Sequence, residues 1–260
     1  MFVDSHAHID GPEFDADREE MIQRAQAAGV TAILNVGTGD PHSGAFERAI
    51  ELGRKHANVY TAIGTHPHDA RLYDDAAEEK TKALIQSGER VLAWGEIGLD
   101  FHYDNSPRDV QIDVFKRQLR AARDLNLPVV IHTREAETET IDILENDYGD
   151  APRRGVFHCF SGSAELAKHA LELDFMISFS GIVTFKKAEE LRSIVRNVPL
   201  DHLLIETDCP YLTPVPHRGK RNEPGYVVEV GRCLADLHGL SVEKLAHITT
   251  ENFTRFFGLQ

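Results

Sequence analysis

Cysteine is scarce in this sequence, and its scarcity excludes several kinds of protein. The 260 residues include three cysteines, and no two of them are spaced as CxxC. So few cysteines, in an odd number, do not form the disulfide framework of small secreted domains. A chain of this length also buries a sufficient core without such crosslinks. We therefore expect a protein of a reducing compartment, the cytoplasm.

The sequence also has no long apolar run. No stretch approaches the roughly 18 residues that a membrane-spanning helix needs, and the start Met1-Phe2-Val3-Asp4 shows neither a basic region nor the apolar segment of a signal peptide. We expect no membrane association, and no feature points to an obligate protein partner.

Positive charge is in short supply. Lysine and arginine number 28 against 42 acidic residues, which gives a net charge of −14. Tight, non-specific binding along duplex DNA depends on neutralising phosphates with cationic side chains, so it is disfavoured here. A nucleic-acid end entering a cleft is not excluded, because bound divalent cations would offset the negative charge locally.

What the sequence does contain is a repeated pattern of short apolar runs, polar loops and amphipathic segments. The predicted strands are Phe2–Ser5, Thr31–Val36, Val59–Gly64, Val91–Glu96, Val129–His132, Gly155–His158, Phe175–Phe179 and Leu203–Asp208. The predicted helices are Arg18–Ala28, Pro107–Leu125, Ser163–Leu173, Lys187–Val195, Tyr226–His238 and Ser241–Ile248. Eight strands alternating with helices predict an α/β protein with a (β/α)8 TIM-type barrel, as one domain over residues 1–260. A doubly wound open sheet is the rival fold, but no strand is followed by GxGxxG.

Residue types that can bind metals stand at the ends of several predicted strands. His6 and His8 close the first strand and point the same way, because side chains alternate along a strand. Further ligand types stand at the ends of four later strands: Glu96, His132, His158 and Asp208. The carboxyl ends of barrel strands form the active site, so these side chains should converge.

Four histidines and two carboxylates exceed the three or four protein ligands of one catalytic zinc. Two divalent ions about 3.5–4 Å apart would use them all. Glu96 suits the bridging position, because its two oxygens can each bind one ion. The imidazole ligands favour Zn or Mn over Mg, although Mg remains open for a weaker second position.

The motifs also resemble those of a known family, the TatD family of metal-dependent deoxyribonucleases, which belongs to the amidohydrolase-like barrels. The resemblance rests on FVDSHAHID, GTHPH, GEIGLD, PVVIHTR, HCFSG and LIETDCPYL, which occur in the family's order between residues 2 and 212. It implies that His6, His8, Glu96 and Asp208 hold one ion, and that Glu96, His132 and His158 hold the other. It also implies 3′–5′ exonuclease or endonuclease action on DNA, and in some members on RNA.

Three residues are predicted to take part in the chemistry. Asp208 is expected to orient and deprotonate the attacking water, Glu96 to bridge the ions, and His66 to contact the scissile phosphate or the leaving group. Two neighbours have open roles. Glu206 either orients a ligand histidine or is a structural carboxylate, and Arg134 either contacts phosphate or forms a salt bridge.

Other functions stay open at this point. The same ion pair would also polarise the carbonyl of a carboxylic ester or amide, including an aminoacyl ester on tRNA. A catalytically weak metal-binding protein is another reading. A metallo-β-lactamase-like nuclease is disfavoured, because its HxHxDH motif is broken here by Gly11 after Asp10.

Overall fold

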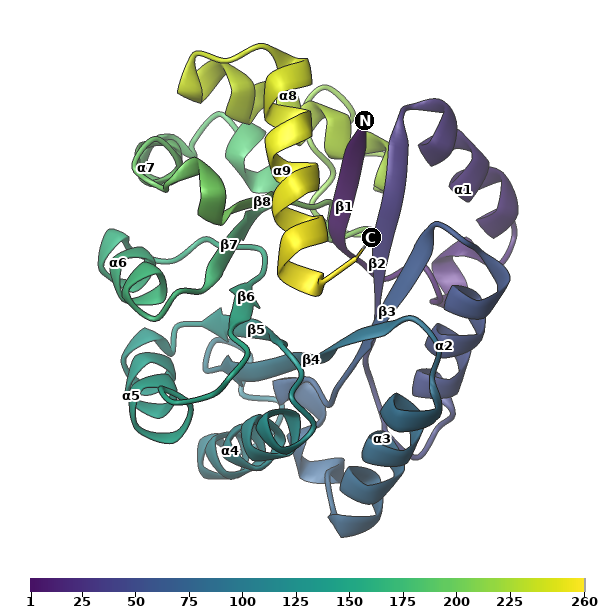
Figure 1. The fold of residues 1–260 in the computed structure, drawn as a ribbon, viewed down its shortest axis with the longest axis vertical. Helices are drawn as coiled ribbons and strands as arrows, with labels where there is room; N and C mark the ends of the chain where they lie inside the picture. The colour runs from purple at the N-terminus through teal and green to yellow at the C-terminus, as the bar shows by residue number, and fades with distance from the viewer. Residues whose placement is uncertain (260) are drawn as a thin grey trace. The chain divides into compact units, whose positions relative to one another are not determined.

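Strands and helices alternate along the chain in the computed structural model, which describes residues 1–259 (Figure 1). The strands are β1 (Phe2–Ala7), β2 (Val30–Gly37), β3 (Val59–Ile63), β4 (Val91–Asp100), β5 (Val129–Arg134), β6 (Gly155–Phe157), β7 (Met176–Phe179) and β8 (Leu203–Ile205). They form one sheet whose strand order follows the chain from β1 to β8. The pairs with a described register are all parallel. The chain therefore has the (β/α)8 barrel fold class that the sequence predicts.

The α-helices follow most of the strands. They are α1 (Arg18–Ala27), α2 (Ala45–Lys55), α3 (Asp75–Ser87), α4 (Arg108–Asp124), α5 (Glu137–Asp147), α6 (Ala164–Glu172), α7 (Glu189–Val195), α8 (Val227–His238) and α9 (Val242–Phe257). Short 3-10 helices are η1 (Pro12–Phe14), η2 (Pro67–Leu72), η3 (Gly181–Thr184), η4 (Leu200–His202) and η5 (Pro224–Tyr226). Among the described residues, no helix combines the length and the apolar character needed to cross a membrane.

Several boundaries differ from the predicted ones. Strand β4 continues past Glu96 to Asp100, and β8 ends at Ile205, so that Asp208 lies in the following loop. Helix α9 runs to Phe257 rather than to Ile248. Helices α2, α3 and α5 were not predicted. In α3 the buried positions are Ala77, Thr81 and Ile85, a face too small and polar to mark a helix by hydrophobic periodicity.

Contacts within the chain divide it into two compact units. Unit 1 comprises residues 1–35, 158–167 and those from 176 onward, and unit 2 comprises residues 36–157 and 168–175. One domain over residues 1–260 stays a prediction.

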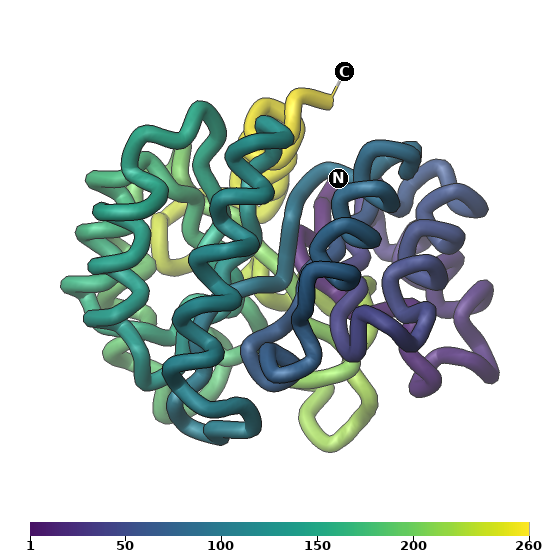
Figure 2. Tube along the Cα trace, turned by 90° about the horizontal axis from the view of Figure 1, so that it is seen from below, coloured from purple at the N-terminus to yellow at the C-terminus, as the bar shows by residue number. Residues whose placement is uncertain are grey.

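In unit 1, β1 packs against α9, the yellow helix of Figure 1. The core includes the fully buried rings of Phe14, Phe179 and Phe253. A long segment between β8 and α8, light green in Figure 2, contains little regular structure. It begins with Glu206, Thr207 and Asp208, and so places three polar residues directly after a buried strand.

In unit 2, the whole length of β5 pairs in parallel with β4, from Val129 opposite Trp94 to Arg134 opposite Asp100. Glycine is required at Gly98, whose φ is +143°. A Cβ atom there would collide with the carbonyl oxygen of His132. This close approach brings the polar end of β4 next to that of β5.

Candidate metal centre

The first strand brings two imidazoles together. His6 lies within β1 and is fully buried, and His8 follows the strand with a partly exposed ring. Their Nε2 atoms are 3.2 Å apart, and the rings are nearly perpendicular at 74°. The two nitrogens therefore face one another, as alternation along a strand predicts.

Asp208 completes this group from the loop after β8. Its N–H donates to the carbonyl of His6 at 3.0 Å, and the N–H of His8 donates to the carbonyl of Cys209 at 2.8 Å. The carboxylate Oδ1 then lies 3.6 Å from Nε2 of His8 and 4.0 Å from Nε2 of His6. Burial raises the pKa of the Asp208 carboxyl, but contacts with His8, His158 and His6 outweigh it and leave the pKa below its ordinary value.

A buried carboxyl, Asp4, anchors the loop that carries Asp208. It accepts hydrogen bonds from the N–H of Thr207 at 2.9 Å and from the Thr207 hydroxyl at 2.5 Å. Burial raises the pKa of Asp4 to about 8, against the opposing effect of these hydrogen bonds. Asp4 thus links β1 to Thr207, the residue before Asp208, through hydrogen bonds that are buried away from water.

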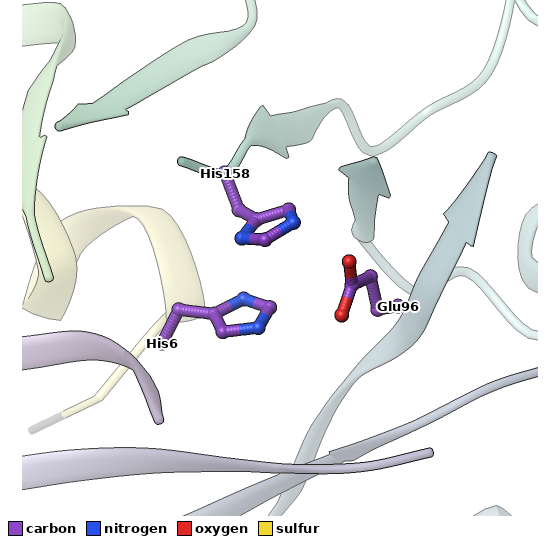
Figure 3. Close-up of side chains that lie close together, drawn as sticks. All are labelled: His6, Glu96 and His158. Carbon is purple, nitrogen blue, oxygen red and sulfur yellow. The ribbon is translucent and has the colours of Figure 1, made fainter. Parts of the chain in front are cut away.

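His158 follows β6 and packs on His6. The two rings stack with their centroids 3.9 Å apart and their planes inclined by 16° (Figure 3). Behind His158, the buried Glu206 has Oε1 3.4 Å from the ring Nδ1 and accepts the N–H of Cys159 at 2.7 Å. Of the two open roles for Glu206, this geometry favours the orientation of a ligand histidine.

Unit 2 holds a second group, formed by His66, Glu96 and His132. Oε1 of Glu96 lies 3.3 Å from Nε2 of His66 and 2.9 Å from Nδ1 of His132. Glu96 is almost fully buried on β4, and Figure 3 draws its side chain on that strand. Both histidine contacts therefore converge on one oxygen of one buried carboxylate.

The position of the proton on His66 follows from its other nitrogen. His66 caps the 3-10 helix η2, because its Nδ1 accepts the N–H of His68 at 3.1 Å. Burial lowers the pKa of His66 to about 4, although the nearby Glu96 opposes this. The neutral ring must then carry its proton on Nε2, which makes His66 a hydrogen-bond donor towards Glu96.

Asp100 lies beyond Glu96 at the end of β4 and contacts two further histidine nitrogens. Its Oδ2 is 3.1 Å from Nε2 of His68 and 3.1 Å from Nε2 of His132. Burial raises the pKa of this carboxyl, but the contacts with His132 and His68 and the N–H of Tyr103 hold it well below its ordinary value. His68, for which the sequence suggested no role, therefore shares an acceptor with a predicted ligand.

Two buried glutamines on α4 hold the backbone of this group, and sequence analysis missed both. Gln118 accepts the N–H of Thr65 at 2.8 Å and donates to its carbonyl at 2.9 Å, next to His66. Gln111 does the same for Asp100, at 2.8 Å and 3.0 Å. They are seven residues apart, hence on one helix face. The available signal was that both glutamines stand at helix positions where an amphipathic helix normally has apolar residues.

The side chains present fit divalent ions. Within each unit the potential ligand atoms of one three-residue group lie within 4.8 Å of one another, namely His6, His8 and Asp208 in unit 1 and His66, Glu96 and His132 in unit 2. In unit 2 the proton on Nε2 of His66 leaves Glu96 and His132 as the residues that would hold an ion. Ligands about 2.1 Å from an ion in tetrahedral geometry are about 3.4 Å apart. The 3.2 and 3.6 Å separations around His8 are close to that value.

Exposed aromatic rings border both groups. Tyr103 is 56% exposed, its ring centroid is 5.5 Å from that of His68, and the Arg134 guanidinium lies 4.8 Å over it. In unit 1, Tyr211 is 59% exposed, with its ring centroid 6.4 Å from that of His8. Arg134 therefore contacts an aromatic face, and within residues 1–259 no salt bridge of its guanidinium is seen.

All the ligands predicted from sequence lie in one of these two groups of side chains or contact one of them. His6, His8, His158 and Asp208 gather in unit 1, and Glu96 and His132 gather in unit 2 with His66. Their roles in binding ions and in catalysis, including the bridging role of Glu96, stay predictions. Cys209 is fully buried, and burial raises the pKa of its thiol well above the ordinary value, so this thiol is poorly suited to act as a nucleophile.

Comparison with known proteins finds close relatives over the whole chain. The family model described as TatD related DNase matches residues 3–258. The uncharacterized metal-dependent hydrolase YabD of Bacillus subtilis is 44% identical, with 99% of both chains covered. The uncharacterized metal-dependent hydrolase YcfH of Escherichia coli is 41% identical, over 99% of this chain and 96% of the relative. The crystal structure of the TatD homologue YjjV from Escherichia coli superposes with a TM-score of 0.92 at 32% identity, covering 100% of this chain and 98% of the other.

Proposed function

Since the chain belongs to the TatD family of metal-dependent hydrolases, we propose that it cleaves phosphodiester bonds of DNA, with RNA as a second substrate, by a 3′–5′ exonuclease reaction. The observation that carries the proposal is the pair of ligand groups, one containing Asp208 and the other containing Glu96. Each combines imidazole nitrogens with a carboxylate, the ligand types of hydrolytic metal sites. We propose two divalent ions, of Zn, Mn or Mg.

Ions held there would supply Lewis-acid polarisation of phosphoryl oxygens and would lower the pKa of a bound water. The residues of the protein would accept and donate protons at the phosphate. Asp208, partly accessible with 13% of its side chain exposed, would orient the attacking water and accept its proton. His66, whose Nε2 proton faces Glu96, would donate this hydrogen bond to a phosphoryl or leaving-group oxygen in place of Glu96 once substrate is bound.

The exposed Tyr103 and Arg134 support a nucleic-acid substrate. Bases of single strands stack on aromatic side chains, and a guanidinium matches phosphate oxygens. An aromatic face beside the His66, Glu96 and His132 group would hold a base next to the cleaved bond. Because the net charge is −14, a flexible strand end is a better substrate than a long duplex.

The test uses one labelled sequence as a single strand and as a blunt duplex, with and without a 3′ block. We expect metal-dependent, stepwise shortening from the 3′ end that is faster for the single strand. Chelation should abolish it, and Mn or Mg should restore it. A panel of carboxylic and aminoacyl esters runs in parallel. Hydrolysis of an ester with DNA left intact, or unchanged cleavage by the metal-free protein, would reject the proposal.

A further inference from the structure

The carboxylate of Asp100 is surrounded by donors on both of its oxygens. Oδ1 accepts the backbone N–H groups of His102 at 3.1 Å and Tyr103 at 2.9 Å. Oδ2 lies 3.1 Å from Nε2 of His68 and 3.1 Å from Nε2 of His132. An ionised carboxylate offers acceptors and no donor, so both imidazole contacts require a proton on Nε2.

This requirement determines what the other nitrogen of His132 presents. An imidazolium would donate from Nδ1 as well, whereas binding a cation requires the neutral ring. With the proton on Nε2, the neutral ring has a lone pair on Nδ1, which lies 2.9 Å from Oε1 of Glu96. This lone pair and the carboxylate oxygen repel each other unless a cation lies beside them. Imidazole nitrogen and carboxylate oxygen are together a common ligand pair for divalent ions.

We propose that Asp100 is a positioning residue that keeps the His132 proton on Nε2, so that Nδ1 and the Glu96 carboxylate together bind a divalent ion. The inference rests on the metal dependence in the proposed function, but not on its substrate. It also separates His132 from His66, whose proton position makes it a donor. A histidine ligand whose other N–H is held by a carboxylate has a fixed ring orientation and higher basicity.

Asp100→Asn is the informative variant, because an amide has one acceptor oxygen where the carboxylate has two. The amide cannot accept from both the backbone N–H groups and the imidazoles. We expect the affinity of one of the Zn²⁺-binding steps, measured by titration against a chromophoric chelator, to fall about 10–100-fold. This is the usual effect of losing a hydrogen-bond partner of a metal ligand. Asp104→Asn is the matched control. Asp104 is exposed and pairs with Arg108, so both binding steps should keep their affinity.

A second measurement needs no variant. Nitrogen chemical shifts of ¹⁵N-histidine in the Zn²⁺-loaded protein should show a protonated Nε2 and an ion-bound Nδ1 for His132. A protonated Nδ1 in the loaded protein would overturn the inference, as would unchanged Zn²⁺ affinity in a folded Asp100→Asn variant.

The two proposals fail separately. A wild-type protein that binds ions through Nδ1 of His132 yet leaves DNA intact would reject the nuclease proposal and keep the role of Asp100. A protein that cleaves DNA and binds ions equally well as Asp100→Asn would reject the role of Asp100 alone.

Discussion

Replacement of Gln118 by methionine tests how the helix layer supports the His66, Glu96 and His132 group. Gln118 is fully buried on α4, and methionine has nearly the same volume, so little cavity should form. Three partners lose a hydrogen bond: the N–H and the carbonyl of Thr65, at 2.8 and 2.9 Å, and the indole N–H of Trp94, at 3.0 Å.

The magnitude follows from those three groups. A buried polar group without a partner costs about 1–3 kcal/mol. Allowing for partial relaxation and for the apolar contacts of methionine, we expect the free energy of unfolding to fall by about 3–5 kcal/mol. Because Thr65 precedes His66, a displaced backbone would also move the donor nitrogen, and hydrolysis should slow.

Urea unfolding measures the loss, with chelator present because bound ions would add to the apparent stability. Gln23→Met, at an exposed position of α1, is the control and should change the free energy of unfolding by less than about 0.5 kcal/mol. A loss below about 1 kcal/mol for Gln118→Met would mean that water replaces these hydrogen bonds and that the argument is wrong.

Other predictions concern the ions, the substrate and pH. Glu96→Ala should lower the occupancy of both ion sites, whereas His158→Ala should lower mainly one; elemental analysis showing two ions in Glu96→Ala would exclude a bridge. Tyr103→Ala should raise KM for a short single strand about 5–150-fold but leave a base-free phosphodiester unchanged, since a stacked base contributes about 1–3 kcal/mol; equal effects on both would exclude stacking. Hydrogen bonds from Arg221 and Arg24 hold the pKa of Asp17 below its ordinary 3.8, so this stabilisation is present above about pH 4 and is lost as pH falls. Asp17→Asn should therefore cost about 0.5–1 kcal/mol at pH 7 and less at pH 3, by thermal unfolding; a constant difference would contradict the assignment.

The alternation of apolar runs and amphipathic segments is sufficient to predict the fold class. Strands buried on both faces, such as β8 (Leu203–Ile205), consist of continuous apolar residues, and such a run indicates a strand of a covered parallel sheet. The candidate ligands were also accessible from sequence, because barrel topology assigns strand ends to one face. His6 and His8 needed only the two-residue period of a strand.

Boundaries and proton positions were decided by tertiary contacts. Asp208 was predicted to end a strand, yet it lies in a loop whose backbone is held by Thr207 and the buried Asp4, a residue about two hundred positions away. The donor character of His66 depends on the N–H of His68, and that of His132 on Asp100. Gln111 and Gln118 looked like ordinary helix residues.

Residue type and spacing thus determined which side chains could bind ions, because those properties are local. Which nitrogen of each histidine carries its proton depends on hydrogen bonds between segments far apart in the chain. Only the folded chain brings those partners together, so this part of the chemistry was decided by the tertiary structure.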